Sequence, residues 1–222
     1  MLSVACILPL VNPLEYNQGM DKLDLKKTLP HLYNPKNKTW EEVEVPAMHF
    51  LMVDGEGNPN TAASYKEAIE ALFSMAYTLK FMSKRELGKD YAVMPLEGLW
   101  YADDMTVFTR RNKDAYKWTM MIAQPEWITG AMVKSAVLTA GKKKDLAALP
   151  KLRFETYAEG RCLQLLHIGS YDDEAPKLAQ LHDELMPARS LKFNGNHHEI
   201  YLSDPRRTTP EKLKTILRQP VA

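Results

Sequence analysis

Cysteine, an excess of charge of one sign and a long apolar run are what this sequence lacks. Only Cys6 and Cys162 are present, too few for a disulfide framework or a cysteine-ligated zinc cluster. Twenty-nine Lys and Arg residues against 28 Asp and Glu residues give a net charge of +1, which provides no electrostatic footprint for nucleic acid. The apolar segment 2–11 is shorter than the roughly 20 residues that span a bilayer. These absences favour a cytoplasmic protein that binds neither nucleic acid directly nor a membrane.

Motifs for cofactors and nucleophiles are absent as well. The Gly55-Glu56-Gly57 turn lacks the lysine and glycine spacing of a phosphate loop. His197 and His198 would point to opposite faces of a strand, so the pair does not predict a metal site. Cys162 and Ser203 lie in no recognisable nucleophile arrangement. We therefore expect no cofactor and no metal.

The residues that are present predict a globular protein with 45% hydrophobic and 26% charged residues. The pattern predicts a strand, a helix capped by Asn60 and stopped by Gly88, and two more strands. These elements span residues 45–53, 60–88, 91–101 and 117–123. A linking helix follows at about 126–149. Met20, followed by polar residues, is a candidate start of the native chain.

The pattern then restarts in the same order. Acids and a proline begin a helix at 172–176, and Pro187 ends it. The strands of this half are expected at 153–157, 161–168, 197–202 and 214–219. Residues 117–125 and 212–220 match at three of nine positions, including a terminal Gln-Pro, and Leu99-Trp100-Tyr101 can be laid beside Glu199-Ile200-Tyr201.

This self-similarity predicts an α+β fold, a tandem pseudo-twofold repeat of strand-helix-strand-strand modules with a central ligand cleft. The modules are expected at about 43–125 and 151–222, with residues 1–42 as a partly irregular N-terminal lead-in. Trp40 in that lead-in is either a lid residue or packed on the core edge.

Glu199 is an acid within a strand pattern that should be half buried. Burying an ionised carboxylate costs several kcal/mol, roughly, unless a partner or a ligand meets it. Alternation places His197, Glu199 and Tyr201 on one face of the strand. We expect the other face, with His198, Ile200 and Leu202, to be mostly apolar.

Three segments, Gly169-Ser170-Tyr171, the run from Glu199 to Pro205 and the run from Pro210 to Val221, resemble the gyrase-inhibitor-like (GyrI-like) small-molecule-binding family. The resemblance covers about residues 43 to 221 and is strongest from 153 onward. It implies two modules around a cleft whose central acid falls on Glu199. The family includes drug-sensing halves of transcription activators. One subfamily of stand-alone proteins hydrolyses cyclopropane-bearing DNA alkylators, and this chain resembles that kind because no helix-turn-helix pattern is found in residues 1–42.

Glu199 has three interpretations: a structural carboxylate, a ligand-binding charge, or a general acid or base whose pKa is raised by desolvation. Glu184 is a second, weaker catalytic candidate. The candidates for ligand contact, each of which could instead be core or surface, are Trp100, Tyr101, Tyr65, Trp127, Tyr157, Tyr171, Glu97 and His167.

The hypothesis is a cofactor-independent hydrolase that holds flat, hydrophobic xenobiotics in an aromatic cleft and detoxifies them by opening a strained cyclopropane ring. The alternative is a protein without catalysis that sequesters drugs or inhibits a partner protein. Replacement of Glu199 by Gln separates the two in part: a binder of neutral ligands should keep its affinity, while a hydrolase should keep binding and lose turnover.

Overall fold

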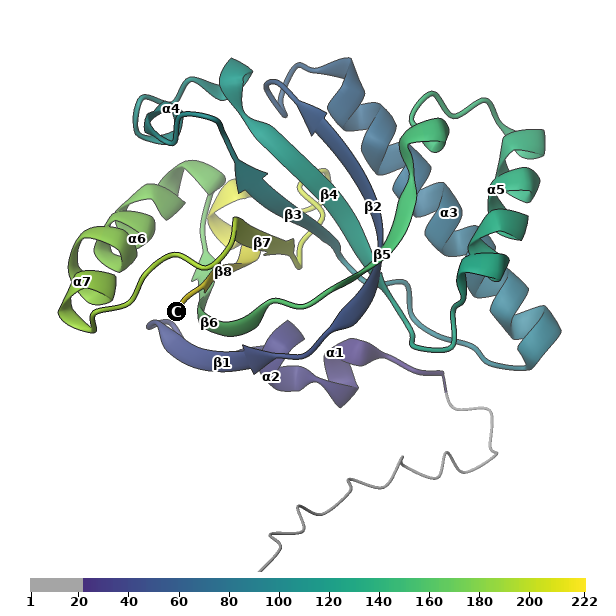
Figure 1. Ribbon diagram of the computed structural model, residues 1–222, viewed down its shortest axis with the longest axis horizontal. Helices are drawn as coiled ribbons and strands as arrows, with labels where there is room; N and C mark the ends of the chain where they lie inside the picture. Colours follow the sequence, from purple (N-terminus) through teal and green to yellow (C-terminus); the bar gives the residue numbers. More distant parts are fainter. Residues whose placement is uncertain (1–21) are drawn as a thin grey trace, which may run out of the picture.

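A computed structural model describes residues 22–222 of the chain (Figure 1). The apolar segment 2–11 and Met20 lie outside the described residues. Within residues 22–222, no helix is both long and apolar enough to cross a membrane.

Eight antiparallel strands form one curled sheet in the order β1-β6-β8-β7-β3-β4-β2-β5 (Figure 1). The strands are β1 (Glu41–Val45), β2 (Met48–Glu56), β3 (Leu96–Tyr101), β4 (Lys117–Gln124), β5 (Arg153–Tyr157), β6 (Gly160–Ile168), β7 (His197–Tyr201) and β8 (Lys214–Pro220). The first four strands and the last four occupy equivalent places around the central β3–β7 pair. The predicted α+β pseudo-twofold repeat is therefore confirmed, with the first strand of each module exchanged onto the other half of the sheet.

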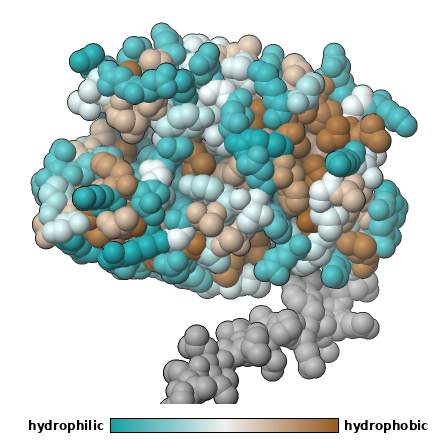
Figure 2. All heavy atoms as spheres, viewed as in Figure 1, coloured by the Kyte–Doolittle hydropathy of each residue, from teal (hydrophilic) through white to brown (hydrophobic). Residues whose placement is uncertain are grey.

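The helices are short except for two. They are α1 (Leu25–Thr28), α2 (Pro30–Tyr33), α3 (Ala63–Leu87), α4 (Thr106–Thr109), α5 (Gly130–Lys143), α6 (Ala175–Ala179) and α7 (Met186–Ala188), with a π-helical turn at Gln180–Leu185 between the last two. In Figure 1, α3 and α5 lie together beside one half of the sheet, and α6 and α7 lie beside the other. Figure 2 shows apolar side chains gathered on the side where α3 and α5 lie.

Proline explains two differences from the predicted elements. The strand expected at 45–53 corresponds to β2, which begins only at Met48, because Pro46, which has no N–H to donate, separates it from a further strand, β1, that was not expected. These two strands lie near opposite ends of the sheet. The strand expected from Tyr91 begins only at Leu96, directly after Pro95.

Of the ends predicted for the first helix and for the linking helix, only the one at Gly88 was right. Gly88 adopts the left-handed conformation with φ of 65° and ends α3, as expected. Asn60 is not its N-cap, since the helix begins after Ala62. The linking helix is shorter than 126–149, because the Thr129 side chain accepts a hydrogen bond from the Met132 amide and starts α5 there.

The two faces of the sheet have different coverings. We call the side that carries Gly98, Trp118 and Glu199 the helix face, because α3 packs on it through Tyr65. The α6–α7 segment covers the same face in the second module, where Leu181 and Met186 join a second core cluster with Trp40, Leu163, Leu165, Leu217 and Val221. We call the opposite side the lead-in face, because α1 and α2 lie on it. Trp40 thus packs on the core edge.

Candidate functional site

Glu199 lies on the helix face where the two modules meet. It is paired in register with Gly98 of β3, and its side chain is 14% exposed. The Tyr201 hydroxyl donates to its Oε2 at 2.8 Å, and the Trp100 indole Nε1 donates to the same hydroxyl at 3.0 Å. The central acid is therefore held by one phenol, and Nε2 of His197 lies 3.6 Å from its Oε1.

Gly98 makes room for this arrangement. A Cβ atom on Gly98 would lie 3.1 Å from Nε1 of Trp100 and 3.2 Å from Sδ of Met120. Because glycine lacks that atom, the indole ring can lie beside the backbone opposite Glu199. The glycine thus allows the Trp100–Tyr201–Glu199 chain of hydrogen bonds to form.

Aromatic rings lie around Glu199. We call this group the aromatic cleft, after the ligand cleft that the sequence predicts between the two modules. Tyr65 of α3 lies between Trp100 and Trp118, with ring centroids at 6.2 and 5.1 Å. The Tyr171 ring meets Tyr201 edge-on at 5.9 Å. The wall continues through Tyr116, whose ring centroid is 6.1 Å from that of Trp100, to Phe108 at 4.4 Å from Tyr116.

The phenols of the cleft are neutral at physiological pH. Burial and the nearby Glu199 raise the pKa of Tyr65 well above its ordinary value. Burial together with Glu174 and Glu199 raises the pKa of Tyr171 to about 12. The rings therefore offer stacking surface and hydroxyl donors rather than negative charge.

Glu174 is a second acid in the cleft, and the sequence analysis did not single it out. Its residue exposure is 4%. Burial, followed by the charge of Glu199, raises its pKa to about 10, so its carboxyl group is protonated near pH 7. Its Oε1 has no hydrogen-bond partner among residues 22–222. The cleft thus holds one acid ready to donate a proton beside one that accepts a hydroxyl hydrogen bond.

A capped 3₁₀ turn, Tyr171–Glu174, delivers Tyr171 and Glu174 to the cleft. Asp173 Oδ2 accepts from both the Ser170 hydroxyl at 2.7 Å and the Ser170 amide at 3.2 Å. Residues three apart eclipse each other in such a turn, which brings Glu174 to the side of Tyr171. An acid three residues after Tyr171 was the available sequence signal, but acids there also suit a helix N-terminus.

The face of β7 opposite Glu199 is mostly apolar, as expected, since Ile200 and Leu202 pack in the core, but His198 brings a buried charge network to the lead-in face. His198 is fully buried between Glu97, at 3.0 Å from its Nε2, and Glu159, at 2.9 Å from its Nδ1. Arg218 completes the network with an ion pair to Glu159 at 3.0 Å and a hydrogen bond to the Leu32 carbonyl at 2.9 Å. The exception at His198 arises because the cations His198 and Arg218 both pair with the Glu159 carboxylate, and paired charges can be buried.

The pKa values in this network follow from that pairing. Burial lowers the pKa of His198, but Glu159 and Glu97 outweigh it and raise the pKa to about 9. Burial also raises the pKa of Glu159, but His198 and Arg218 outweigh it and lower the pKa to about 2. All of the network's cations and the Glu159 carboxylate are charged at pH 7, which fits a structural role.

The structure brings four of the predicted residues together in the cleft: Glu199, Trp100, Tyr65 and Tyr171. It places three others on the lead-in face. Glu97 belongs to the charge network and accepts the Tyr33 hydroxyl at 3.1 Å. Tyr101 and Tyr157 line a separate cavity there. Tyr101 follows Trp100 by one residue, and neighbouring strand residues point to opposite faces.

The remaining three predicted residues lie away from Glu199. Trp127 donates to the Ser83 hydroxyl at 2.9 Å and packs on Tyr91. His167 bonds the Ser170 carbonyl at 3.0 Å, so it supports the turn before Tyr171. Glu184 is exposed on the π-helical turn between α6 and α7.

Comparison with known proteins gives the chain a family and structural relatives. The family model of the GyrI-like small molecule binding domain matches residues 39–222. No curated protein matches the chain. An uncharacterized conserved protein from Listeria innocua is 38% identical, with a TM-score of 0.83 over 90% of this chain and 100% of that one.

Two further structures extend the comparison. A protein described as a hydrolase from Listeria innocua is 37% identical, with a TM-score of 0.82 over 91% of this chain and 100% of that one. The C-terminal domain of EcmrR has a TM-score of 0.51 at 10% identity over 82% of this chain and 98% of that one. The likeness to the EcmrR domain shows only that the two share a fold.

Proposed function

The chain belongs to the GyrI-like small-molecule-binding family, and from that premise we propose that its aromatic cleft holds flat, hydrophobic xenobiotics and hydrolyses an electrophilic cyclopropane ring in them. The observation that carries the proposal is a pair of acids, Glu199 and Glu174, enclosed by aromatic rings. The similarity to a Listeria innocua protein described as a hydrolase supports it. The ligand class would be DNA-alkylating compounds in which the ring is conjugated to a carbonyl group.

The aromatic cleft suits a planar ligand. Tyr65 and Trp100 have ring planes only 30° apart, so a flat compound can stack along them. Tyr171, which is 40% exposed, forms the rim. Neutral phenols and an indole cost little to desolvate compared with charged groups, so an uncharged hydrophobic ligand binds without displacing ion pairs.

The two acids divide the proton transfers. Water attacks a ring carbon while Glu199 takes the proton that this water releases. The carbon–carbon bond of the cyclopropane breaks, and its electron pair moves into the conjugated carbonyl, whose oxygen receives the proton of Glu174. A proton then returns from Glu199 to Glu174 by way of solvent. The product is the ligand plus one water.

Sequestration without catalysis is the second candidate, because the matching family is described by small-molecule binding. The same aromatic cleft would hold the ligand. An alkylator retained there cannot reach DNA, so binding alone would protect a cell.

The test is incubation of the purified protein with a cyclopropane-bearing alkylator, followed by chromatography and mass spectrometry. We expect multiple turnovers to a product one water heavier. Glu199→Gln should lower the rate by about 10²- to 10⁴-fold, the usual range for general acid–base catalysis, while tryptophan fluorescence still reports binding. Glu184→Gln is the matched control, because Glu184 is exposed and remote from the aromatic cleft.

Two results would reject hydrolysis. Unchanged compound that co-purifies with the wild-type protein would identify a binding protein. Equal turnover by the wild type and Glu199→Gln would remove Glu199 from the chemistry. A loss of turnover in Glu184→Gln alone would favour the weaker candidate acid instead.

A further inference from the structure

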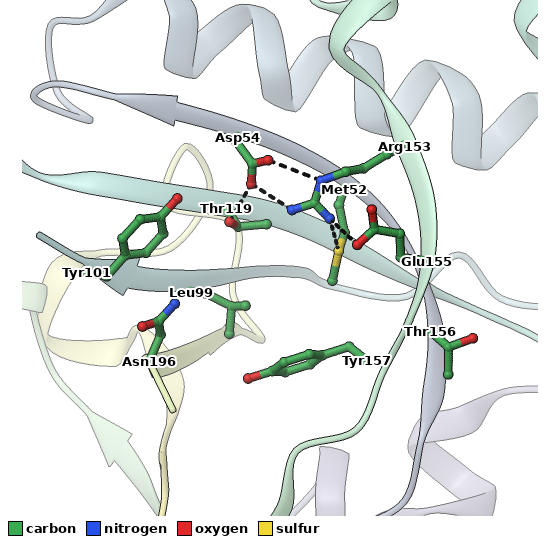
Figure 3. Close-up of a pocket in the computed structure, with 10 residues that line it drawn as sticks. All are labelled: Met52, Asp54, Leu99, Tyr101, Thr119, Arg153, Glu155, Thr156, Tyr157 and Asn196. Atoms are coloured by element: carbon green, nitrogen blue, oxygen red, sulfur yellow. Dashed lines mark hydrogen bonds and ion pairs between the residues drawn. The ribbon is translucent and has the colours of Figure 1, made fainter. Parts of the chain in front are cut away.

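We propose that the lead-in face carries a second ligand site, which binds a single hydroxylated ring bearing an amino group, such as an amino sugar. The site is a cavity of about 290 Å³ over β2, β3, β4 and β5 (Figure 3). It is separate from the aromatic cleft and does not depend on the proposed hydrolysis. Its volume is at the lower limit of ligand pockets, which matches one ring rather than an extended planar drug.

The floor and walls of the cavity differ in polarity. Met52, Leu99 and Thr119 form a buried floor. In Figure 3, Tyr101 and Tyr157 flank the space from two sides, and Arg153 lies on a third. A ring with apolar C–H groups on its faces and polar groups on its edge fits an apolar floor with aromatic walls.

The side chains of the polar wall are joined by hydrogen bonds and carry an excess of negative charge. Arg153 donates to Asp54 through Nε at 3.1 Å and Nη2 at 2.7 Å, and to Glu155 through Nη1 at 2.8 Å. The Thr119 hydroxyl donates to Asp54 at 2.5 Å. Two carboxylates face one guanidinium whose three nitrogens all have acceptors. The wall therefore disfavours an anion and favours a ligand that brings an ammonium group and hydroxyl donors.

Three further groups at the cavity have free hydrogen-bonding capacity. The hydroxyls of Tyr101 and Tyr157 and the amide of Asn196 make no side-chain hydrogen bond within residues 22–222, although all three line the cavity. Burial, with Glu159 nearby, raises the pKa of Tyr157 well above its ordinary value, so its hydroxyl stays a donor. Groups that both donate and accept, arranged around a ring-sized space, match hydroxyls at several ring positions.

The geometry makes the second site distinguishable from the aromatic cleft. Tyr101 faces the cavity, and its neighbour Trp100 faces the cleft, because strand side chains alternate. Asn196 precedes β7 and is exposed, so its truncation should leave the fold intact. Substitutions at Asn196 and Tyr101 therefore report on this cavity, and Tyr171→Phe reports on the cleft.

The experiment titrates the full-length protein with glucosamine, followed by saturation-transfer NMR, up to about 10 mM. Glucose and cyclohexylamine are the comparison probes. We expect glucosamine to bind more tightly than either, because it alone has both the ammonium group and the hydroxyls. Asn196→Ala and Tyr101→Phe should each weaken binding by about three- to tenfold, the effect of one lost hydrogen bond. Tyr171→Phe should leave the affinity unchanged.

Four results would overturn the proposal. One is the absence of any glucosamine signal in the titration. Another is cyclohexylamine binding as tightly as glucosamine, which would show that the hydroxyls are not needed, or glucose doing so, which would show that the amine is not needed. A third is unchanged affinity in both Asn196→Ala and Tyr101→Phe. The last is a loss confined to Tyr171→Phe, which would place the ligand in the aromatic cleft.

Discussion

The acids buried on the two faces of β7 have different partners: cations on the lead-in face and a neutral phenol on the helix face. On the lead-in face, Glu97 and Glu159 meet the cations His198 and Arg218 at 2.9 to 3.0 Å. On the helix face, Glu199 meets a phenol at 2.8 Å, and its nearest basic nitrogen, on His197, is 3.6 Å away. A buried acid with matched cations is structural, whereas one held by a neutral phenol leaves its carboxylate available to a ligand.

The two faces also depend on each other. Arg218, Glu159 and His198 connect α2, β7 and β8 through one set of contacts. His198 precedes Glu199 in the same strand, and Glu97 precedes its partner Gly98. The charge network therefore fixes the backbone that positions the catalytic candidate, without touching the aromatic cleft.

The largest expected effect on stability comes from disrupting the charge network on the lead-in face. Arg218→Ala would leave Glu159 without its arginine partner and the Leu32 carbonyl without its donor. Removal of one partner from a buried pair costs about 3–5 kcal/mol, and urea unfolding should show that loss. A loss below about 1 kcal/mol would mean that the network is not a structural element.

The next effect concerns the pH dependence of stability. The pKa of Glu174, raised from 4.5 to about 10, means that the folded state keeps a proton that the unfolded state releases. Its contribution to stability is full below pH 4.5 and is lost as pH rises toward 10. From pH 6 to 8, the free energy of unfolding of the wild type should fall by up to about 3 kcal/mol more than that of Glu174→Gln.

Urea unfolding at pH 6, 7 and 8 measures this difference. The His198 pKa, raised from 6.5 to about 9, gives stability that is also lost over pH 6.5 to 9, but in both proteins. Parallel curves for wild type and Glu174→Gln would show that Glu174 is ionised in the folded state.

A smaller effect is expected from removing one hydroxyl on the helix face. Tyr201→Phe deletes the donor to Glu199 and the acceptor of the Trp100 indole. A hydrogen bond to a charged group contributes about 1.5 kcal/mol at the lower end, so turnover of the alkylator should fall about tenfold while binding persists. Tyr116→Phe is the control, because Tyr116 makes only ring contacts with the cleft. Unchanged turnover in Tyr201→Phe would mean that this hydroxyl does not tune Glu199.

The smallest effect should come from an exposed ion pair. Arg161 binds Glu42 through two hydrogen bonds of 2.8 and 2.9 Å between β6 and β1, and both side chains are exposed to nearly half their area. Arg161→Ala should barely shift the midpoint of urea unfolding, because water screens the pair. If Arg161→Ala destabilised the protein as much as Arg218→Ala does, the expectation that a buried ion pair contributes more to stability than an exposed one would be wrong.

Local chemistry made parts of the fold predictable. Gly88 marked the end of α3, and the matched Gln-Pro segments marked β4 and β8 as counterparts. The overlay of Trp100 with Ile200 was off in register, because the structure places Trp100 on the face of Glu199 and Ile200 on the other. A shift of one residue reverses the face of a strand residue, so a short motif could not decide which neighbours line the cleft.

The sequence by itself determined the repeat, the order of the elements and the alternation that turns Glu199 away from His198, because these depend on residues close together in the chain. Only the tertiary structure decided that Glu97 and Glu159 reach His198, that Glu174 joins Glu199, and that Tyr101 faces a second cavity. Those outcomes depend on which strands pair across the sheet and on how deeply each acid is buried. Burial and charge partners, which set pKa values and roles, come from segments far apart in the sequence.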